Sequence, residues 1–484
     1  MSEVRNELGG SKKLKITDAV AQSVGFMGPV FSSAFLIPLL VGVNVSGNGA
    51  GGAAPLAVLL ATIGLLGLGW IISEYAKRIH AAGSLYDYVT DGLGKKIGAA
   101  AGIAYYVGIM ALGGGILVLI GGTIHDTLAS EFNFTAIPYF AWDILLLLIA
   151  GGLLFAGVSI STRTQLILAG FSLLVVTIFF IDVIIQVGSH NSFKAFNPST
   201  SPNGMKGILF GVLYGVLLFT GFETSANLAE ETEHPKRDIP RAVLTALLIA
   251  AVFYVLAAYA QVAGFGFSIK AITAAAAGPL FALGSPAHSG GYGSIAIRRL
   301  LELVVIFDML AVYVGVSVSA SRGLFAMARD RWLSASLSTT NSGRGTPKGA
   351  SILILALYLA VILLTKFDSG LFALPQTPHY AAIFSWLSTF GPFALSIVYL
   401  LVAIGAIKGL ADHPRRWAVY LATTVSGITI AAAIFGSIYK VPAPTIYASY
   451  GGLGVFIVAL IYTTTKKKPQ AVIVATPAVA NGSA

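Results

Sequence analysis

Long apolar segments follow one another along almost the whole of this 484-residue chain and constrain its fold more than any other feature. A helix that crosses the hydrocarbon core of a bilayer needs about 20 consecutive, largely apolar residues. A charged fraction of only 10% is too small to cover a water-soluble protein of this length. The sequence therefore predicts an all-α polytopic membrane protein with 12 transmembrane helices, at 17–43, 54–78, 97–125, 138–158, 164–188, 205–229, 241–266, 295–325, 348–366, 380–407, 415–438 and 444–465.

The basic residues indicate how the chain is oriented. If the N-terminus lies in the cytoplasm, most of the 30 Lys and Arg residues fall in loops and ends on that same side. The net charge of +10 is then explained by the membrane surface, without nucleic acid as a partner. Residues 1–16 are polar and basic and lack the apolar region of a signal peptide, so the first span is expected to be retained. Both tails, 1–16 and 466–484, are expected in the cytoplasm.

Several function classes are excluded by what the sequence lacks. It contains no Cys, which excludes disulfides, iron–sulfur clusters and thiolate metal sites. It also contains no His-Glu-x-x-His motif, no paired catalytic Asp motif and no nucleotide-binding loop. We therefore expect no enzymatic activity, no catalytic residue, no metal and no other cofactor.

Two of the apolar segments are interrupted near their middle. Segment 17–43 contains Gly28 and Pro29, and segment 205–229 contains Gly221. Pro29 removes a backbone donor and clashes with the preceding turn, so a helix break is expected there. Gly and Pro also serve ordinary helix packing in membranes, and for segment 17–43 alone that explanation is equally good.

The pairing of the two interrupted segments favours a repeated architecture. Interrupted helices at corresponding positions of two halves are typical of transporters built from inverted repeats. We therefore expect a first repeat at 17–190, a second at 204–407 and a helix pair at 415–465. The prediction is a 5+5 inverted repeat with broken helices 1 and 6, followed by two C-terminal helices.

Segment 205–229 also carries a carboxylate, Glu223, within otherwise lipid-compatible sequence. An ionisable group at membrane depth is costly unless it faces a cavity or a partner, so it indicates a functional site. The Thr220-Gly221 step just before it is where the helix is expected to open. The alternative is a satisfied carboxylate that only caps the second half of the helix.

Three polar motifs border the predicted spans. They read EYAKRIHAAGSLYDY at 74–88, EETEHPKRDIPRA at 230–242 and SRGLFAMARD at 321–330, the last followed by Thr346-Pro347. Together they resemble motifs of the amino acid–polyamine–organocation (APC) superfamily of permeases, and the resemblance covers most of the chain. The chain departs from the family pattern at His80, where Pro is usual, and at His234, where Asn is usual.

The resemblance implies a LeuT-type fold, with a bundle of spans 1, 2, 6 and 7, a scaffold of spans 3, 4, 8 and 9, and gating by spans 5 and 10. In such a fold, backbone N–H groups at the break in span 1 bind a substrate carboxylate, and carbonyls at the break in span 6 accept the ammonium. Pro29 cannot donate, and Phe222 is expected to close over the substrate side chain. The implied substrate contacts are Gly25, Met27, Gly28, Val30, Phe31, Phe219, Thr220, Gly221 and Phe222.

Four residues are candidates for ion coupling, with either a proton or a sodium ion as the coupling ion. Glu223 is the sharpest candidate, and Asp308 in segment 295–325 is either a second coupling site or a paired group inside the scaffold. Proton-coupled relatives can carry a Lys in span 5 where sodium otherwise binds, and alignment puts Ser172 at that position. Ser317 in span 8 is a further hydroxyl for a sodium site, although Ser in a membrane helix usually bonds its own backbone.

The resemblance also implies gate and loop-packing residues on the cytoplasmic side. These are Glu74, Tyr86, Arg237, Arg241 and Arg322.

These patterns predict a secondary active amino acid transporter of the plasma membrane that works by alternating access, as a proton-coupled symporter or an exchanger. Arginine–agmatine exchangers place a Trp four residues before the Gly of span 6. The chain has Leu217 there, which favours a small or neutral amino acid over a guanidinium. A polyamine- or ethanolamine-type amine permease is the alternative, because Pro29 weakens the carboxylate site. A membrane receptor without transport is less favoured, and both a monomer and a homodimer are compatible with the sequence.

Overall fold

The computed structural model of the chain describes residues 8, 13–42, 49–275, 278–341, 345–368, 370, 372–373, 378–439, 441 and 443–466. Most of the expected tails, 1–16 and 466–484, lies outside the described residues. Within them the chain is helical and forms no β-strand, only isolated bridges such as that between Leu14 and Thr232. The all-α prediction is confirmed for this part of the chain.

The long helices are α1 (Ile16–Met27), α2 (Pro29–Val41), α3 (Ala54–Ala76), α5 (Lys95–Phe132), α6 (Tyr139–Ala156), α7 (Val158–Val187), α8 (Gly204–Leu218), α9 (Pro235–Gly264), α12 (Ile295–Arg329), α13 (Lys348–Phe367), α14 (His379–Gly409), α15 (Arg416–Gly436) and α16 (Thr445–Thr465). The short α-helices are α4 (Leu85–Leu93), α10 (Ile269–Ala274) and α11 (Pro279–Gly284). The 3₁₀ helices are η1 (Gly51–Ala53), η2 (Gly188–His190), η3 (Phe193–Phe196), η4 (Pro198–Thr200), η5 (Thr224–Glu231), η6 (Ala287–Ser289) and η7 (Ala335–Ser338).

Eleven helical stretches of the described chain are long and apolar enough to cross a membrane. The first of them, Ile16–Val41, consists of α1 and α2 and contains the predicted break at Gly28. The sixth predicted segment differs from the others, because α8 has only 15 residues and is followed by turns and then by η5. Of the twelve predicted spans, eleven therefore correspond to long apolar stretches of the described chain, and the sixth corresponds only to the shorter apolar helix α8.

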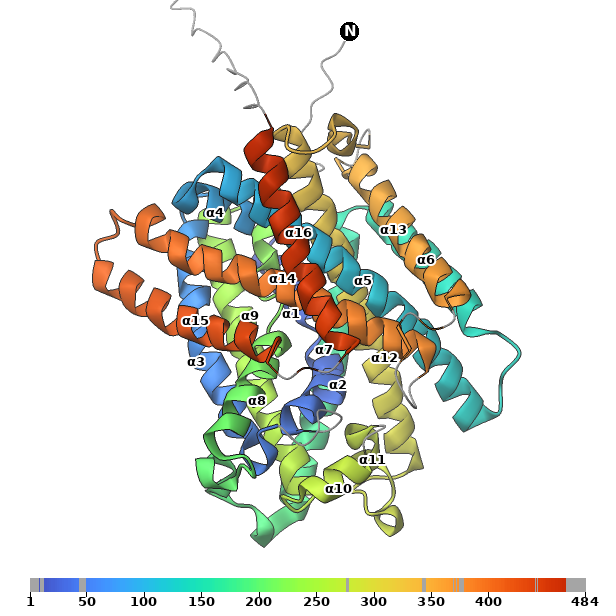
Figure 1. Ribbon diagram of the computed structural model, residues 1–484. Coiled ribbons are helices and arrows are strands. Elements are labelled where there is room, and N and C mark those ends of the chain that lie inside the picture. Colours follow the sequence, from blue (N-terminus) through green and yellow to red (C-terminus); the bar gives the residue numbers. More distant parts are fainter. Residues whose placement is uncertain are drawn as a thin grey trace, which may run out of the picture.

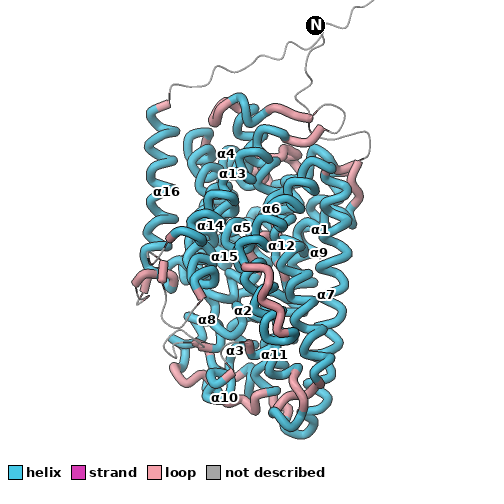
Figure 2. The backbone as a smooth tube through the Cα atoms, turned by 90° about the vertical axis from the view of Figure 1, so that its right-hand side faces the viewer, coloured by secondary structure: helices cyan, strands magenta, loops and turns pink. Residues whose placement is uncertain are grey.

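The helices run mainly between two ends of the molecule, where most of the loops gather (Figure 2). The helix α4 and the last turn of α16 lie at one end, and α10 and α11 lie at the other (Figure 1). Helices α3 and α9 pack together, with α1 against α9 and α8 against α3. A second group consists of α5, α6, α12 and α13, while α14 packs against α5 and α7 packs against α12.

Large apolar side chains are exposed on the outer helices. Ile167 and Ile185 of α7 are 69% and 70% exposed, and Ile428 of α15 is 67% exposed. Such surfaces are unfavourable in water and favourable in hydrocarbon. The chain is therefore a multi-pass membrane protein whose polar groups are gathered inside the helix packing and at its two ends.

Candidate functional site

The break between α1 and α2 depends on Gly28. This residue has φ of 55°, in the left-handed region that favours glycine, and Pro29 follows it as the first residue of α2. A Cβ atom at position 28 would overlap the side chain of Val312 on α12. The neighbouring Gly25 packs closely on α7, since a Cβ atom there would lie 2.7 Å from Oε1 of Gln165.

The break after α8 depends in the same way on Gly221. The helix ends at Leu218, and Gly221 has φ of 103° in the turns that lead to η5. A Cβ atom at position 221 would overlap the ring of Phe26, so the two breaks touch each other. The hydroxyl of Tyr254 donates to the free carbonyl of Leu218 at 2.7 Å. The opened backbone is thus satisfied by side chains, as membrane depth requires.

A cavity lies where the two breaks meet α5, α12 and α14. Its polar side chains carry hydroxyl groups, and none of the described residues that line it is charged. The rings of Phe31 and Phe384 meet edge to face at its wall, with centroids 5.8 Å apart. The cavity is lined by Phe26, Met27, Phe31, Ser32, Leu36, Leu112, Ile116, Leu217, Thr220, Val312, Phe384, Ser388 and Pro392.

Three of the predicted substrate contacts, Met27, Phe31 and Thr220, line this cavity. The others lie beside it and form its frame. Phe219 packs edge to face on Tyr254 with centroids 5.1 Å apart, and Phe222 packs on Tyr399 with centroids 6.0 Å apart. Gly25, Gly28, Val30 and Gly221 are likewise buried in the packing around the cavity.

Glu223 is fully buried directly after the second break. Its Oε1 accepts a hydrogen bond from the Tyr105 hydroxyl at 2.6 Å, and its Oε2 accepts one from the Tyr399 hydroxyl at 2.8 Å. Tyr105 belongs to α5 and Tyr399 to α14, so the carboxylate ties the opened stretch to both helices. Each oxygen has a neutral donor, which is the satisfied arrangement that a buried carboxylate needs.

Asp308 of α12 is also fully buried, and its partner is a backbone group. Its Oδ2 accepts a hydrogen bond from the N–H of Phe31 at 2.8 Å, in the first turn of α2. Its Oδ1 is buried and has no hydrogen-bond partner among the residues that the structure describes. The partner of Asp308 is thus the start of α2, which belongs to span 1 and not to the scaffold spans, and no ion pair to Asp308 occurs among the described residues.

The two predicted hydroxyl ligands bond main-chain carbonyls. The Ser172 hydroxyl lies 2.8 Å from the carbonyl oxygens of both Leu168 and Val304 and can donate to either. The contact with Val304 joins α7 to α12. Ser317 donates to the carbonyl of Tyr313 at 2.7 Å. Both contacts are of the backbone-bonding kind that is usual for Ser in membrane helices.

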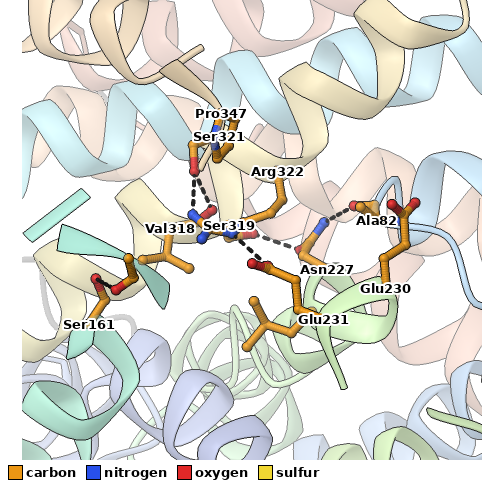
Figure 3. Close-up of polar contacts among 12 residues, drawn as sticks. Ala82, Ser161, Asn227, Glu230, Glu231, Val318, Ser319, Ser321, Arg322 and Pro347 are labelled. Carbon is orange, nitrogen blue, oxygen red and sulfur yellow. Dashed lines mark hydrogen bonds and ion pairs between the residues drawn. The ribbon is translucent and has the colours of Figure 1, made fainter. Parts of the chain in front are cut away.

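Arg322, one of the predicted gate residues, is the centre of a buried polar network (Figure 3). Its Nε donates to Oε2 of Glu231 at 3.0 Å, and the two side chains are only 1% and 3% exposed. Its Nη1 donates to the hydroxyl of Ser321 at 2.8 Å. The pair joins η5 to α12, that is, the second half of the broken segment to the helix that carries Asp308.

A second set of contacts surrounds this pair. Asn227 donates to the carbonyl of Ala82 at 2.8 Å and accepts from the Ser319 hydroxyl at 2.7 Å (Figure 3). Glu230 accepts two hydrogen bonds from Arg329, at 2.6 and 2.9 Å. These contacts lie toward the end of the molecule where α4 lies.

The remaining predicted gate residues differ in their surroundings. The Tyr86 hydroxyl donates to Asp330 at 2.8 Å within the same end of the molecule. Glu74 pairs with Lys77 at 2.6 Å. Arg237 pairs with its neighbour Asp238 at 2.7 Å and is 55% exposed, and Arg241 is exposed.

Sequence reasoning missed several residues of the site. Tyr105 and Tyr399 carry the only direct contacts of the Glu223 oxygens among the described side chains. A signal for them existed, because a phenol in an apolar span needs a partner for its hydroxyl. Phe384 and Leu112 carry no such signal. An apolar residue is equally common where a span faces lipid and where it lines a cavity, so the sequence cannot distinguish the two positions.

Comparison with known proteins adds independent information. The model of the amino acid permease family matches residues 25–474 of the chain. The branched-chain amino acid permease of Lactococcus lactis subsp. cremoris is 26% identical over 343 residues, which cover 68% of this chain and 71% of that protein. The branched-chain amino acid permease of Bacillus subtilis is 23% identical over 343 residues, covering 64% and 68%. The mitochondrial cationic amino acid transporter 3 of Arabidopsis thaliana is 27% identical over 335 residues, covering 65% and 52%.

Proposed function

This chain belongs to the amino acid permease family, and from that premise we propose that it is a secondary active transporter of small or neutral amino acids. It works by alternating access in the plasma membrane, with both termini in the cytoplasm. The observation that carries the proposal is the cavity at the junction of the two helix breaks. Broken helices around a central cavity are how such transporters build their substrate sites.

The lining of the cavity supports a substrate with an apolar side chain. Aromatic and aliphatic residues of α1, α2, α5, α8, α12 and α14 form its wall, and its polar side chains carry hydroxyls. Leu217 lies at the position where guanidinium exchangers carry a Trp, so the wall offers no indole ring to a cation. Two of the relatives are branched-chain amino acid permeases, which agrees with this choice.

The two breaks supply complementary backbone groups for the two ends of an amino acid. The first turn of α2 presents N–H groups, which favour a carboxylate. The carbonyls near Phe219 and Thr220 accept from the ammonium group, because the helix has opened there. Transport requires only that the substrate binds two conformations of this site, so no catalytic residue is needed.

The alternating motion follows from the 5+5 inverted repeat that the sequence predicts. The bundle comprises the segments containing α1, α3, α8 and α9, and the scaffold comprises α5, α6, α12 and α13. The contacts that tie them at one end, such as Arg322 to Glu231, then break when that end opens. Coupling to a proton is supported by two fully buried carboxyl groups near the breaks, Glu223 and Asp308, which can take up a proton at membrane depth.

A second candidate, an amine permease, is favoured by one observation. Pro29 has no N–H, and the N–H of Phe31 already donates to Asp308, so the start of α2 offers few free donors to a substrate carboxylate. An amine without a carboxylate does not need these donors.

The test is counterflow of radiolabelled substrates in proteoliposomes, with leucine, isoleucine, alanine, arginine, isoamylamine and putrescine as the panel. Leucine and isoleucine should exchange, and Phe384→Ala should weaken leucine exchange because the wall loses a ring. Phe435→Ala is the matched control, since this Phe lies on α15 and is 62% exposed. Exchange of the amines but of no amino acid would replace the proposal by the second candidate.

The same proteoliposomes test the role of Glu223. With proton and sodium gradients imposed separately, Glu223→Gln abolishes accumulation if this carboxylate carries the coupling proton. If accumulation survives, Glu223 holds the opened stretch against α5 and α14, as its two phenol contacts support.

A further inference from the structure

We propose that Asp308 is a tethered competitor of the substrate carboxylate, and that its displacement from the start of α2 couples amino acid binding to the uptake of one proton. This inference rests on the proposed function, because it assigns the coupling step of the same site. In this step the backbone amides at the start of α2 exchange the carboxylate of Asp308 for the carboxylate of the substrate.

The first observation is that Asp308 holds the donors that a substrate carboxylate would need. The first N–H groups of a helix have no partner within it. In α2 the first residue is Pro29, which has no N–H, and the N–H of Ser32 already donates to Gly28 at 2.8 Å. The N–H of Phe31 donates to Oδ2 of Asp308 at 2.8 Å, and the N–H of Val30 also interacts with this carboxylate. A second carboxylate can bind these amides only if Asp308 leaves them.

The second observation is that Asp308 is only half satisfied. Its side chain is fully buried, and within the described part of the chain Oδ1 has no hydrogen-bond partner. A buried polar atom without a partner costs free energy, so this contact is easier to exchange than a fully satisfied one. Glu223, in contrast, has a donor on each oxygen.

The third observation is that Asp308 adjoins the cavity. Phe31, whose N–H it holds, lines the cavity, and so does Val312, one helical turn further along α12. A carboxylate that leaves the amides therefore does so beside the place where the substrate carboxylate arrives.

The surroundings supply no other charge to Asp308. The titratable group that interacts with it is Tyr254 of α9, whose hydroxyl donates to Leu218. The helix α2 contributes backbone N–H groups, and α7 contributes Ser172, whose hydroxyl bonds the carbonyl of Val304 one turn away. Among the described residues no Lys, Arg or His forms an ion pair with Asp308.

The ionised Asp308 releases the amides of Val30 and Phe31, the carboxylate of the zwitterionic amino acid binds them, and one proton forms an O–H bond on Asp308. An ionised carboxylate without donors inside a membrane protein costs several kcal/mol, so the proton accompanies the displacement. When the substrate leaves on the other side, Asp308 returns to the amides and releases the proton there. One proton thus crosses with each amino acid.

Leucine binding to the purified protein in detergent, measured calorimetrically between pH 5 and 8, tests this exchange. In the wild type, binding should weaken by up to about tenfold for each pH unit as pH rises, which is the linkage of one proton. Asp308→Asn and Asp308→Ala should both abolish this dependence. Two variants are used because Ala leaves space while Asn keeps the shape. Glu302→Gln is the matched control on the same helix and should retain the wild-type slope. A pH-independent wild type, or Asp308 variants with an unchanged slope, would overturn the proposal.

Transport separates this proposal from the proposed function. In proteoliposomes, Asp308→Asn should still exchange labelled for unlabelled leucine but should lose accumulation driven by a proton gradient. Proton-driven accumulation that persists in Asp308→Asn refutes the role of Asp308 and leaves the transporter assignment intact. A wild type that exchanges no amino acid refutes the proposed function itself, and the coupling proposal with it.

Discussion

Replacing Arg322 with Met should lower the free energy of unfolding by about 3–5 kcal/mol, because it leaves Glu231 buried and unpaired. The two side chains are 1% and 3% exposed, and the charged atoms are 3.0 Å apart. At that distance and an effective dielectric constant of about 20, the attraction is on the order of 5 kcal/mol, and Arg322→Met removes it while Glu231 stays desolvated. In the double variant Arg322→Met/Glu231→Gln neither charge is left alone, so much of the lost stability should return.

The assay is equilibrium unfolding in mixed micelles for the wild type, both single variants and the double variant. Arg78→Met is the control, because Arg78 pairs with Asp412 at the surface, where the two side chains are 35% and 76% exposed. Its loss should cost far less than the loss of Arg322, because solvent screens an exposed ion pair. The reasoning is refuted if Arg322→Met costs no more than this control, or if the double variant is no more stable than Arg322→Met.

Two further predictions concern the second helix break and the end of the molecule that carries α4. Gly221→Ala should abolish leucine counterflow, because φ of 103° and the adjacent aromatic ring exclude a Cβ atom, whereas Gly427→Ala, with open space around it, should transport normally. Burial, followed by the charges of Asp330 and Glu230, raises the pKa of Asp87 from 3.8 to about 7. The unfolded chain therefore loses this proton at lower pH than the folded protein, and stability should fall as pH rises from about 4 to about 7. Asp87→Asn should reduce that fall in a thermal melting series and Asp91→Asn should not; equal slopes in all three proteins would contradict the assignment.

The helix breaks could be predicted from the sequence because their causes are local. Pro29 cannot continue a helix, and Gly28 and Gly221 adopt positive φ that other residues rarely reach. The buried carboxylates could be predicted for a similar reason, since a charge within an apolar segment is visible in the sequence alone. Both features depend on residues that lie within a few positions of each other.

The partners of those carboxylates could not be predicted, because they lie far away in the chain. Asp308 and Phe31 are 277 residues apart, and Glu223 and Tyr399 are 176 apart. The sequence left Asp308 as either a coupling group or a paired one, and it could not show that the partner is a backbone amide. The residues of the cavity wall could not be predicted from the sequence for a related reason. The sequence does not show which face of α5 points toward the cavity, because the membrane-spanning part of this helix is apolar on all sides. Leu112 could therefore not be assigned to the cavity wall.

The three buried carboxylates near the broken segment differ in what they would lose by changing partners. Glu231 would lose an ion pair to a guanidinium, and Glu223 would lose two phenol donors. Asp308 would lose only backbone N–H contacts to one of its oxygens. A substrate carboxylate supplies to those amides the same interaction that Asp308 gives up, so the exchange at Asp308 is the least costly of the three.

This order predicts which carboxyl group gains a proton when an amino acid binds. Infrared difference spectra on addition of leucine should show a new band of a protonated carboxyl group in the wild type. The band should persist in Glu223→Gln and disappear in Asp308→Asn, provided that leucine binding to each variant is confirmed by calorimetry. A band that disappears in Glu223→Gln and persists in Asp308→Asn would mean that the two phenol contacts are exchanged more readily than the backbone contact, and the ranking by hydrogen-bond satisfaction would be wrong.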